Sequence, residues 1–201
     1  MTAMLTRFKR TSRTALISVI ALVILGAGYW YFVFRPADQL RRGLQLAAAI
    51  QVGQTTRSEF RQMAKQYGVR IDEFPNAFGF AQSNRVLEYL HLAPRTVVET
   101  NVGLDNGLVE VVSVRASIGN GGEIAYINIR EFNARDTSCG HVPVCVKPVT
   151  STMSTTVIFS PSVPISERRH LLSLNWWCLA KLGGCKSSRE FFPVAWEKQY
   201  Q

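Results

Sequence analysis

The sequence predicts an α+β domain behind a single N-terminal transmembrane helix. Three observations support this prediction. Residues 14–34 contain no charged side chain, residues 37–67 repeat apolar side chains at helical spacing, and from residue 85 onward turn signals separate segments rich in β-branched residues. Of the 201 residues, the 35–201 part is long enough to bury one hydrophobic core. One domain is therefore expected after the helix.

The apolar segment has the length of a membrane span. At about 1.5 Å rise per residue, a helix over residues 14–34 matches a hydrocarbon core of about 30 Å. Residues 1–13 form a basic tail. Residues 1–35 carry five of the 23 basic residues and none of the 14 acidic residues. The net charge of +9 is thus concentrated at the membrane, which favours a lipid partner over a nucleic acid.

The cysteines decide the predicted orientation. Basic residues occur on both sides of the span, so charge alone is a weak guide. All four cysteines lie in residues 133–201, and disulfides persist in oxidising compartments. We therefore expect a cytoplasmic N-terminus and a periplasmic domain at the bacterial inner membrane. A cleaved signal peptide is the alternative, but the apolar segment is longer than the usual signal core, which favours an uncleaved signal anchor.

Two helices are expected directly after the span. Residues 37–50 combine good helix formers with leucines on one face. Thr56 and Glu59 fit a capping box that opens a second helix, and Gly68 is suited to end it. These helices are expected to cover one face of a sheet.

The middle of the chain predicts a small antiparallel meander. Its turns are marked by Asp105-Asn106-Gly107 and Asn120-Gly121-Gly122. The expected strands are residues 85–91, 96–104, 108–116 and 123–132. Short turns leave no room for crossover helices, so neighbouring strands should pair in sequence order.

The cysteine-containing part, residues 133–201, is predicted to be mostly loop and helix. Residues 133–148 read as a loop, and residues 156–159 as a further strand. A helix is expected from Ser166 to Leu182, ended by Gly183-Gly184, with a short helix starting near Ser187 or Ser188.

Two segments resemble known proteins. Val52-Gly53-Gln54-Thr55-Thr56-Arg57-Ser58-Glu59-Phe60 resembles the helix entry of small envelope proteins of the outer-membrane-assembly lipoprotein and β-lactamase-inhibitor-like fold, in which two helices precede an antiparallel sheet. The tail from Asn175 to Trp196 is similar to the C-termini of membrane-anchored soil-bacterial proteins, particularly from acidobacteria. The first resemblance implies a fold, and its lipidated cysteine is missing here. The second implies only a source.

Four cysteines are disulfide candidates. They are Cys139, Cys145, Cys178 and Cys185, which allow three pairings that the sequence leaves open. A structural role in an oxidising compartment is the main interpretation. A zinc site, with or without His141, would need closer knuckle spacings, and a thiol enzyme would be expected to show C-x-x-C.

No segment has the pattern of a catalytic or cofactor site. His91, His141 and His170 lack a nucleophile motif, and Glu88, Glu99 and Glu110 fit a solvated sheet surface. We therefore expect no catalytic residue, no metal and no cofactor. The alternative is an extracytoplasmic hydrolase in which His141 or His170 meets a carboxylate and a hydroxyl group.

Aromatic residues are concentrated near the C-terminus and form a candidate partner surface. They are Trp176, Trp177, Phe191, Phe192, Trp196 and Tyr200. The competing interpretation is that they fill the core under a disulfide-linked tail. We expect a membrane-anchored envelope protein that acts by protein–protein interaction, in envelope assembly or as an inhibitor-like module, with an accessory subunit of a membrane complex as a further alternative.

Overall fold

The computed structural model describes seven stretches of the chain. They are residues 2–83, 85–119, 124–131, 143–149, 154–175, 177–180 and 183–197. Four residues singled out above, Cys139, His141, Trp176 and Tyr200, and the turn at residues 120–122 lie outside them. The predictions made for these residues are therefore not addressed by the structure.

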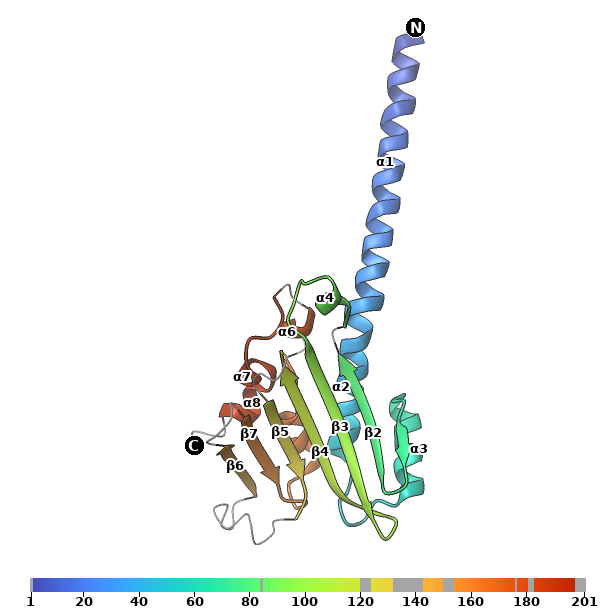
Figure 1. Ribbon diagram of the computed structural model, residues 1–201. Helices are drawn as coiled ribbons and strands as arrows, with labels where there is room; N and C mark the ends of the chain where they lie inside the picture. Colours follow the sequence, from blue (N-terminus) through green and yellow to red (C-terminus); the bar gives the residue numbers. More distant parts are fainter. Residues whose placement is uncertain are drawn as a thin grey trace.

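A single helical rod runs from the N-terminus into the domain. It consists of α1 (Thr2–Tyr29), the π-helical turn η1 (Trp30–Phe34) and α2 (Arg35–Ala49). Figure 1 shows α1 projecting alone from the domain, while α2 packs along the sheet. The helix from Ala15 is long and apolar enough to cross a membrane. The rod thus joins the predicted span to the domain without a linker.

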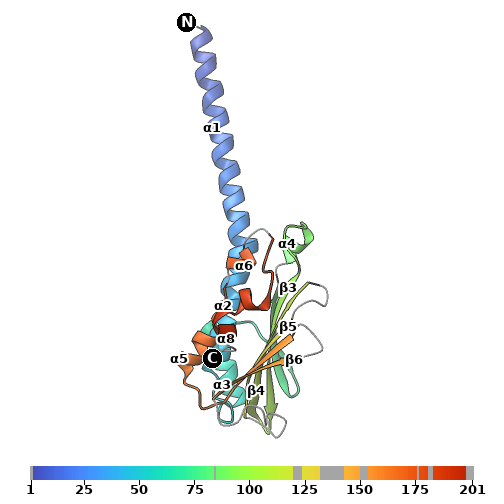
Figure 2. The ribbon, with the colours of Figure 1, turned by 90° about the vertical axis from the view of Figure 1, so that its left-hand side faces the viewer.

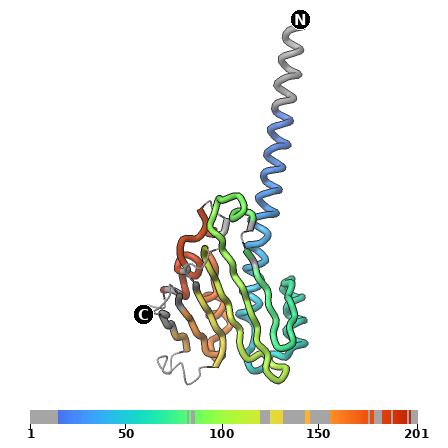
Figure 3. The backbone as a smooth tube through the Cα atoms, viewed as in Figure 1, coloured from blue at the N-terminus to red at the C-terminus, as the bar shows by residue number. Residues whose placement is uncertain are grey.

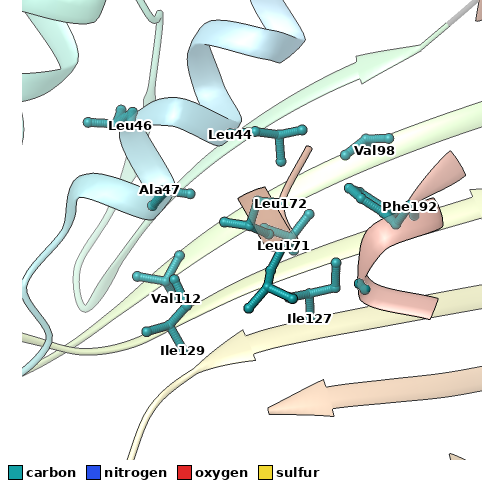
Figure 4. Packing of buried hydrophobic residues seen from close by; sticks show 14 of the residues in the cluster. Leu44, Leu46, Ala47, Val98, Val112, Ile127, Ile129, Leu171, Leu172 and Phe192 are labelled. Atoms are coloured by element: carbon teal, nitrogen blue, oxygen red, sulfur yellow. The ribbon is translucent and has the colours of Figure 1, made fainter. Parts of the chain in front are cut away.

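The face of α2 that meets the sheet is apolar and closely packed. Leu40, Leu44 and Ala47 are almost fully buried, as the periodicity predicts. Gly43 lies on the same face, and a Cβ atom there would overlap the ring of Phe80 on β2. The absence of a side chain at Gly43 therefore lets the helix approach the sheet (Figure 4 shows the surrounding core).

Helix α3 (Arg57–Tyr67) confirms the predicted capping box. The Thr56 N–H donates to Glu59 Oε2 at 2.8 Å, and the Glu59 N–H donates to Thr56 Oγ1 at 3.3 Å. Gly68 ends the helix with φ +65°, a conformation that glycine adopts without steric cost. Arg57 Nη2 then donates to the Phe74 carbonyl at 2.7 Å, which fastens α3 to the first strand of the sheet.

The sheet has seven strands in the order β1-β2-β3-β4-β5-β7-β6. The strands are β1 (Asp72–Phe74), β2 (Ala77–Ser83), β3 (Thr96–Asp105), β4 (Leu108–Ile118), β5 (Ile124–Ile129), β6 (Val144–Val149) and β7 (Ser154–Phe159). Figure 3 follows the backbone up and down through the first five, which pair antiparallel in sequence order.

The small antiparallel meander predicted from the sequence is wrong in extent and in type. Strand β7 pairs parallel with β5 on one side and antiparallel with β6 on the other, so the sheet is mixed. Residues 144–148, expected as loop, lie in the edge strand β6 (Val144–Val149). Lys147 and Pro148 lower their strand signal, and both are residue types that protect a sheet edge from further pairing.

The expected strand at residues 85–91 is also wrong, because residues 85–89 form the short helix α4 (Arg85–Tyr89). Apolar alternation over so few residues does not distinguish a strand from a helical turn. Strand β2 supplies the extra strand instead, ahead of α4.

The C-terminal part contains four short helices. They are α5 (Ile165–Leu171), α6 (Trp177–Ala180), α7 (Ser188–Phe191) and α8 (Pro193–Glu197). The single helix predicted from Ser166 to Leu182 is wrong, since it ends at Leu171. Leu171 and Leu172 are both buried, and the Asn175 N–H donates to the Phe191 carbonyl at 2.9 Å instead of continuing the helix. Tertiary packing here outweighs helix propensity.

Candidate functional site

The sheet has one covered and one open face. Helices α2, α3, α5 and α8 lie on the same side of it (Figure 2). On β3, Val98, Thr100 and Val102 face the helices and are buried, whereas Glu99 is half-buried and Asn101 is exposed. Side chains alternate along a strand, and β2, β4 and β5 repeat this division. On β7, Ile158 is in register with the open-face residue Asn128 but is buried, so the face is open mainly over β2 to β5.

Strand register aligns the open-face side chains in rows. One row runs Glu99, Arg115, Tyr126 and Thr156 across β3, β4, β5 and β7. The next row runs Asn101, Ser113 and Asn128 across β3, β4 and β5. We call these seven residues the open-face rows.

The first row contains a direct contact between a cation and an aromatic ring. The Arg115 guanidinium lies 5.7 Å from the centre of the Tyr126 ring. Glu99 is in register with Arg115 on the neighbouring strand, so opposite charges are adjacent across the pair. Arginine and tyrosine are the residue types that most often carry binding energy at protein interfaces.

The second row is small and polar. Asn101, Ser113 and Asn128 each offer both hydrogen-bond donors and acceptors on short side chains. Tyrosine, serine and asparagine together make a surface that combines a rigid anchor with adaptable polar contacts. The open-face rows contain no histidine or cysteine.

Two further depressions lie in the helical layer. An open one of about 580 Å³ lies between the end of α2 and α3 and is lined by glutamines, among them Gln51, Gln62 and Gln66. A smaller one of about 210 Å³ lies between α2 and α5, and Leu44, Leu172 and Arg169 are among the residues that line it. Neither lining includes a histidine or a cysteine.

The aromatic residues predicted as a partner surface are separated by the fold. Phe191 and Phe192 are fully buried in the core. They fill the space between the C-terminal helices and the sheet, which removes them from any surface of the folded domain. Trp177 has 61% of its surface exposed, at the start of α6. Trp196 lies in α8, and its side chain is outside the described part of the structure.

The cysteines hold the C-terminal part in place. Cys178 and Cys185 form a disulfide with a Cα–Cα distance of 4.7 Å, and both are buried. This is one of the two local pairings that the sequence leaves open. Cys145 on β6 is also disulfide-bonded. These three cysteines therefore form covalent cross-links in the fold and are not available as thiols or metal ligands.

The described histidines and acids among those considered from the sequence lie apart from one another. His91 follows α4, His170 lies exposed on α5, and Glu88 lies in α4 away from the strands that carry Glu99 and Glu110. Among the residues searched, which are those that the structure describes, no group of three or more His, Cys, Asp or Glu side chains could hold a metal ion.

The perturbed ionisable groups serve the fold and lie outside the open-face rows. Hydrogen bonds from the backbone and side chain of Thr56 lower the pKa of Glu59. The bond to Arg61 lowers the pKa of Glu73 and raises that of Arg61, and this ion pair links α3 to β1. Burial lowers the pKa of Arg168. Glu59 caps α3, whereas Arg61, Glu73 and Arg168 link separate segments of the chain.

No protein-family model, no curated protein and no solved structure matches this chain. The choice of the open-face rows as the candidate site therefore rests on their geometry alone. Sequence reasoning did not find them, because the pairing of Arg115 with Tyr126 follows only from strand register. The signal that was present is the alternation of Ser113, Arg115 and Ser117 with valine and alanine on β4.

Proposed function

We propose that this chain is a single-pass bacterial membrane protein whose extracytoplasmic domain binds a partner protein through the open-face rows. The observation that carries the proposal is an open face of a seven-stranded sheet, fixed by an unbroken helical rod to an apolar helix. A rod without a linker holds the face at one orientation relative to its anchor. Such an arrangement suits presentation of a binding surface to another envelope component.

The apolar helix and the disulfides support the proposed location. One helix is long enough to cross a membrane, and a disulfide such as Cys178–Cys185 persists in an oxidising, extracytoplasmic compartment. Residues 1–13 carry only basic charges, which favours a cytoplasmic N-terminus. An inner-membrane protein with a periplasmic domain is the form of the proposal that agrees with these observations.

Envelope assembly or inhibitor-like binding is the more specific version of this role. Both need a partner recognised by a preformed surface, and neither needs catalytic groups. A hydrolase is the rival class, and it would need His141 or His170 to meet a carboxylate and a hydroxyl group. His170 is exposed on α5. Loss of a detected hydrolytic activity in His170→Ala would favour the hydrolase.

The test is photo-crosslinking from the open face in cells of the source organism. A photoreactive residue is placed at Asn101 or Asn128 in the full chain, and adducts are identified by mass spectrometry. The same residue at Gln66, which is exposed on α3 in the helical layer, is the matched control. The proposal expects one protein adduct that forms from the open face and not from Gln66.

The second arm measures the contribution of the anchor residue. Replacing Tyr126 by alanine should weaken partner binding by about 2 kcal/mol, roughly thirtyfold, if the ring is a hot spot. Arg70→Ala, at an exposed position after α3, should leave binding unchanged. Equal adducts from both faces, or a Tyr126→Ala variant that binds as well as the parent, would contradict the proposal. Co-purification that depends only on residues 14–34 would favour the accessory-subunit alternative.

A further inference from the structure

The end of the domain from which α1 emerges carries exposed apolar side chains. Beyond Phe34, the described residues with large exposed apolar side chains are Phe74, Tyr89, Leu90, Leu92, Leu108 and Trp177. Tyr89, Leu90, Leu92 and Trp177 have 83%, 53%, 43% and 61% of their surfaces exposed. We call these four the membrane-proximal cluster, because they belong to α4, α6 and the turn after α4, which lie nearest α1 in Figure 1.

The membrane-proximal cluster is physically joined to the end of the apolar helix. Helix α6, which begins at Trp177, lies against η1. The Gly183 N–H, just after α6, donates to the Leu92 carbonyl at 2.7 Å. Figures 1 and 2 both place α6 beside the junction of the rod, and α4 lies at the same end of the domain, apart from the rod in Figure 2. The disulfide from Cys178 to Cys185 closes the α6 loop, so the three parts form one unit.

The turn after α4 satisfies its own backbone groups. The His91 N–H donates to the Glu88 carbonyl at 2.9 Å, and the Leu92 N–H donates to the Leu87 carbonyl at 2.8 Å. This is the hydrogen-bond pattern of a Schellman motif, with His91 at φ +56° in the position that glycine usually takes. Unsatisfied N–H groups are costly near hydrocarbon, so a closed turn of this kind can carry apolar side chains into a membrane interface.

We propose that the membrane-proximal cluster lies in the lipid headgroup region of the leaflet that η1 leaves. This rests on the proposed function, because it requires the apolar helix to span the bilayer. If η1 lies at the membrane surface, α6 must lie there too, since the two are in contact. Tyrosine and tryptophan side chains favour this interface. The domain is then held by the rod and by a second contact.

Photo-crosslinking to lipid tests this contact in the full chain, reconstituted in vesicles of phosphatidylethanolamine and phosphatidylglycerol. A photoreactive phenylalanine analogue replaces Tyr89 or Leu90 in separate variants. Phe74 and Leu108 are the matched controls, as exposed apolar positions outside the membrane-proximal cluster. Val23, in the apolar helix, reports whether that helix is embedded.

The expected result at Val23 is a lipid adduct. At Tyr89 and Leu90 the yield of lipid adduct should be about tenfold or more above the yield at the two controls, because burying one such side chain favours the apolar site by at least that factor. Adduct at Val23 with Tyr89 and Leu90 no higher than Phe74 and Leu108 would overturn this inference and leave the membrane anchor intact. Adducts from Tyr89 and Leu90 to protein only would overturn it as well. Absence of lipid adduct at Val23 would overturn the anchor and this inference together.

Discussion

The Arg168 guanidinium donates a hydrogen bond from Nη1 to the backbone carbonyl of Ile50 at 2.7 Å, across 118 positions of sequence. Ile50 follows the last residue of α2, where the helix presents unpaired carbonyls and the negative end of its dipole. Arg168 also donates to the carbonyls of Val163 and Pro161. Only 4% of its surface is exposed. One buried cation thus ties the C-terminal helices to the rod.

Loss of this cation should destabilise the domain strongly. Arg168→Leu leaves three backbone carbonyls without their donor, so we expect the free energy of unfolding to fall by about 3 kcal/mol or more. The measurement is urea unfolding of the detergent-solubilised chain. Arg169→Leu is the control, because Arg169 is exposed and donates to the exposed Tyr67 hydroxyl at 3.2 Å. It should change stability by less than about 0.5 kcal/mol. Similar losses of unfolding free energy in both variants would contradict this role of Arg168.

Removing the hydroxyl group of Thr100 should stabilise the domain. Its hydroxyl is buried on the covered face of β3 and has no hydrogen-bond partner in the described structure. Thr100→Val keeps the shape and removes the unpaired polar atom, so we expect a gain of about 1 kcal/mol in the same unfolding assay. Thr96 is equally buried, but its hydroxyl donates to the Pro94 carbonyl at 3.4 Å. Thr96→Val should therefore not stabilise the chain, and a gain in both variants would argue against the explanation.

Replacing His91 by glycine should stabilise the folded chain, whereas replacing His170 by glycine should destabilise it. His91 has φ +56°, where a side chain costs about 1 kcal/mol relative to glycine. His91→Gly is expected to raise the free energy of unfolding by about that amount. His170 lies in α5, where glycine costs about 0.5–1 kcal/mol. His170→Gly should lower stability, and the same sign of change at both sites would be inconsistent with the two backbone conformations.

The cap of α3 should weaken in acid. Hydrogen bonds from Thr56 lower the pKa of Glu59, so the stabilisation is complete above the ordinary glutamate pKa of about 4.3 and is lost as pH falls through the lowered pKa. We expect the protection of the first α3 amides, measured as their hydrogen-exchange rate relative to the unstructured rate at the same pH, to fall in that acid range. Glu59→Gln should remove this dependence. Glu110→Gln, at an exposed position of β4, should retain it, and an unchanged profile in Glu59→Gln would contradict the cap.

Local signals predicted several elements of the first half of the chain. The apolar helix, the periodicity of α2, the capping box at Thr56 and the turn at Asn106 are each encoded locally. The sheet beyond β5 was not predictable in the same way. Its parallel pairing of β5 with β7 depends on contacts between distant segments, and the break after Leu171 depends on a hydrogen bond to Phe191.

The candidate site was the least predictable part, for the same physical reason. The local sequence does not distinguish the aromatic residues near the C-terminus from one another, yet Phe191 is buried and Trp177 is exposed. Tyr126 and Arg115 are unremarkable in sequence and become neighbours only through register. Surfaces built across strands carry no contiguous motif.

Cysteine labelling in cells tests the central claim most directly. Spheroplasts of a bacterial host expressing the full chain are treated with a membrane-impermeant maleimide, before and after an impermeant reductant, and the labelled sites are mapped by mass spectrometry. The account predicts that Cys145, Cys178 and Cys185 are unlabelled before reduction and labelled after it, with the membrane intact. Free thiols that react only after lysis would place the domain in the cytoplasm and contradict a membrane-anchored, extracytoplasmic binding domain.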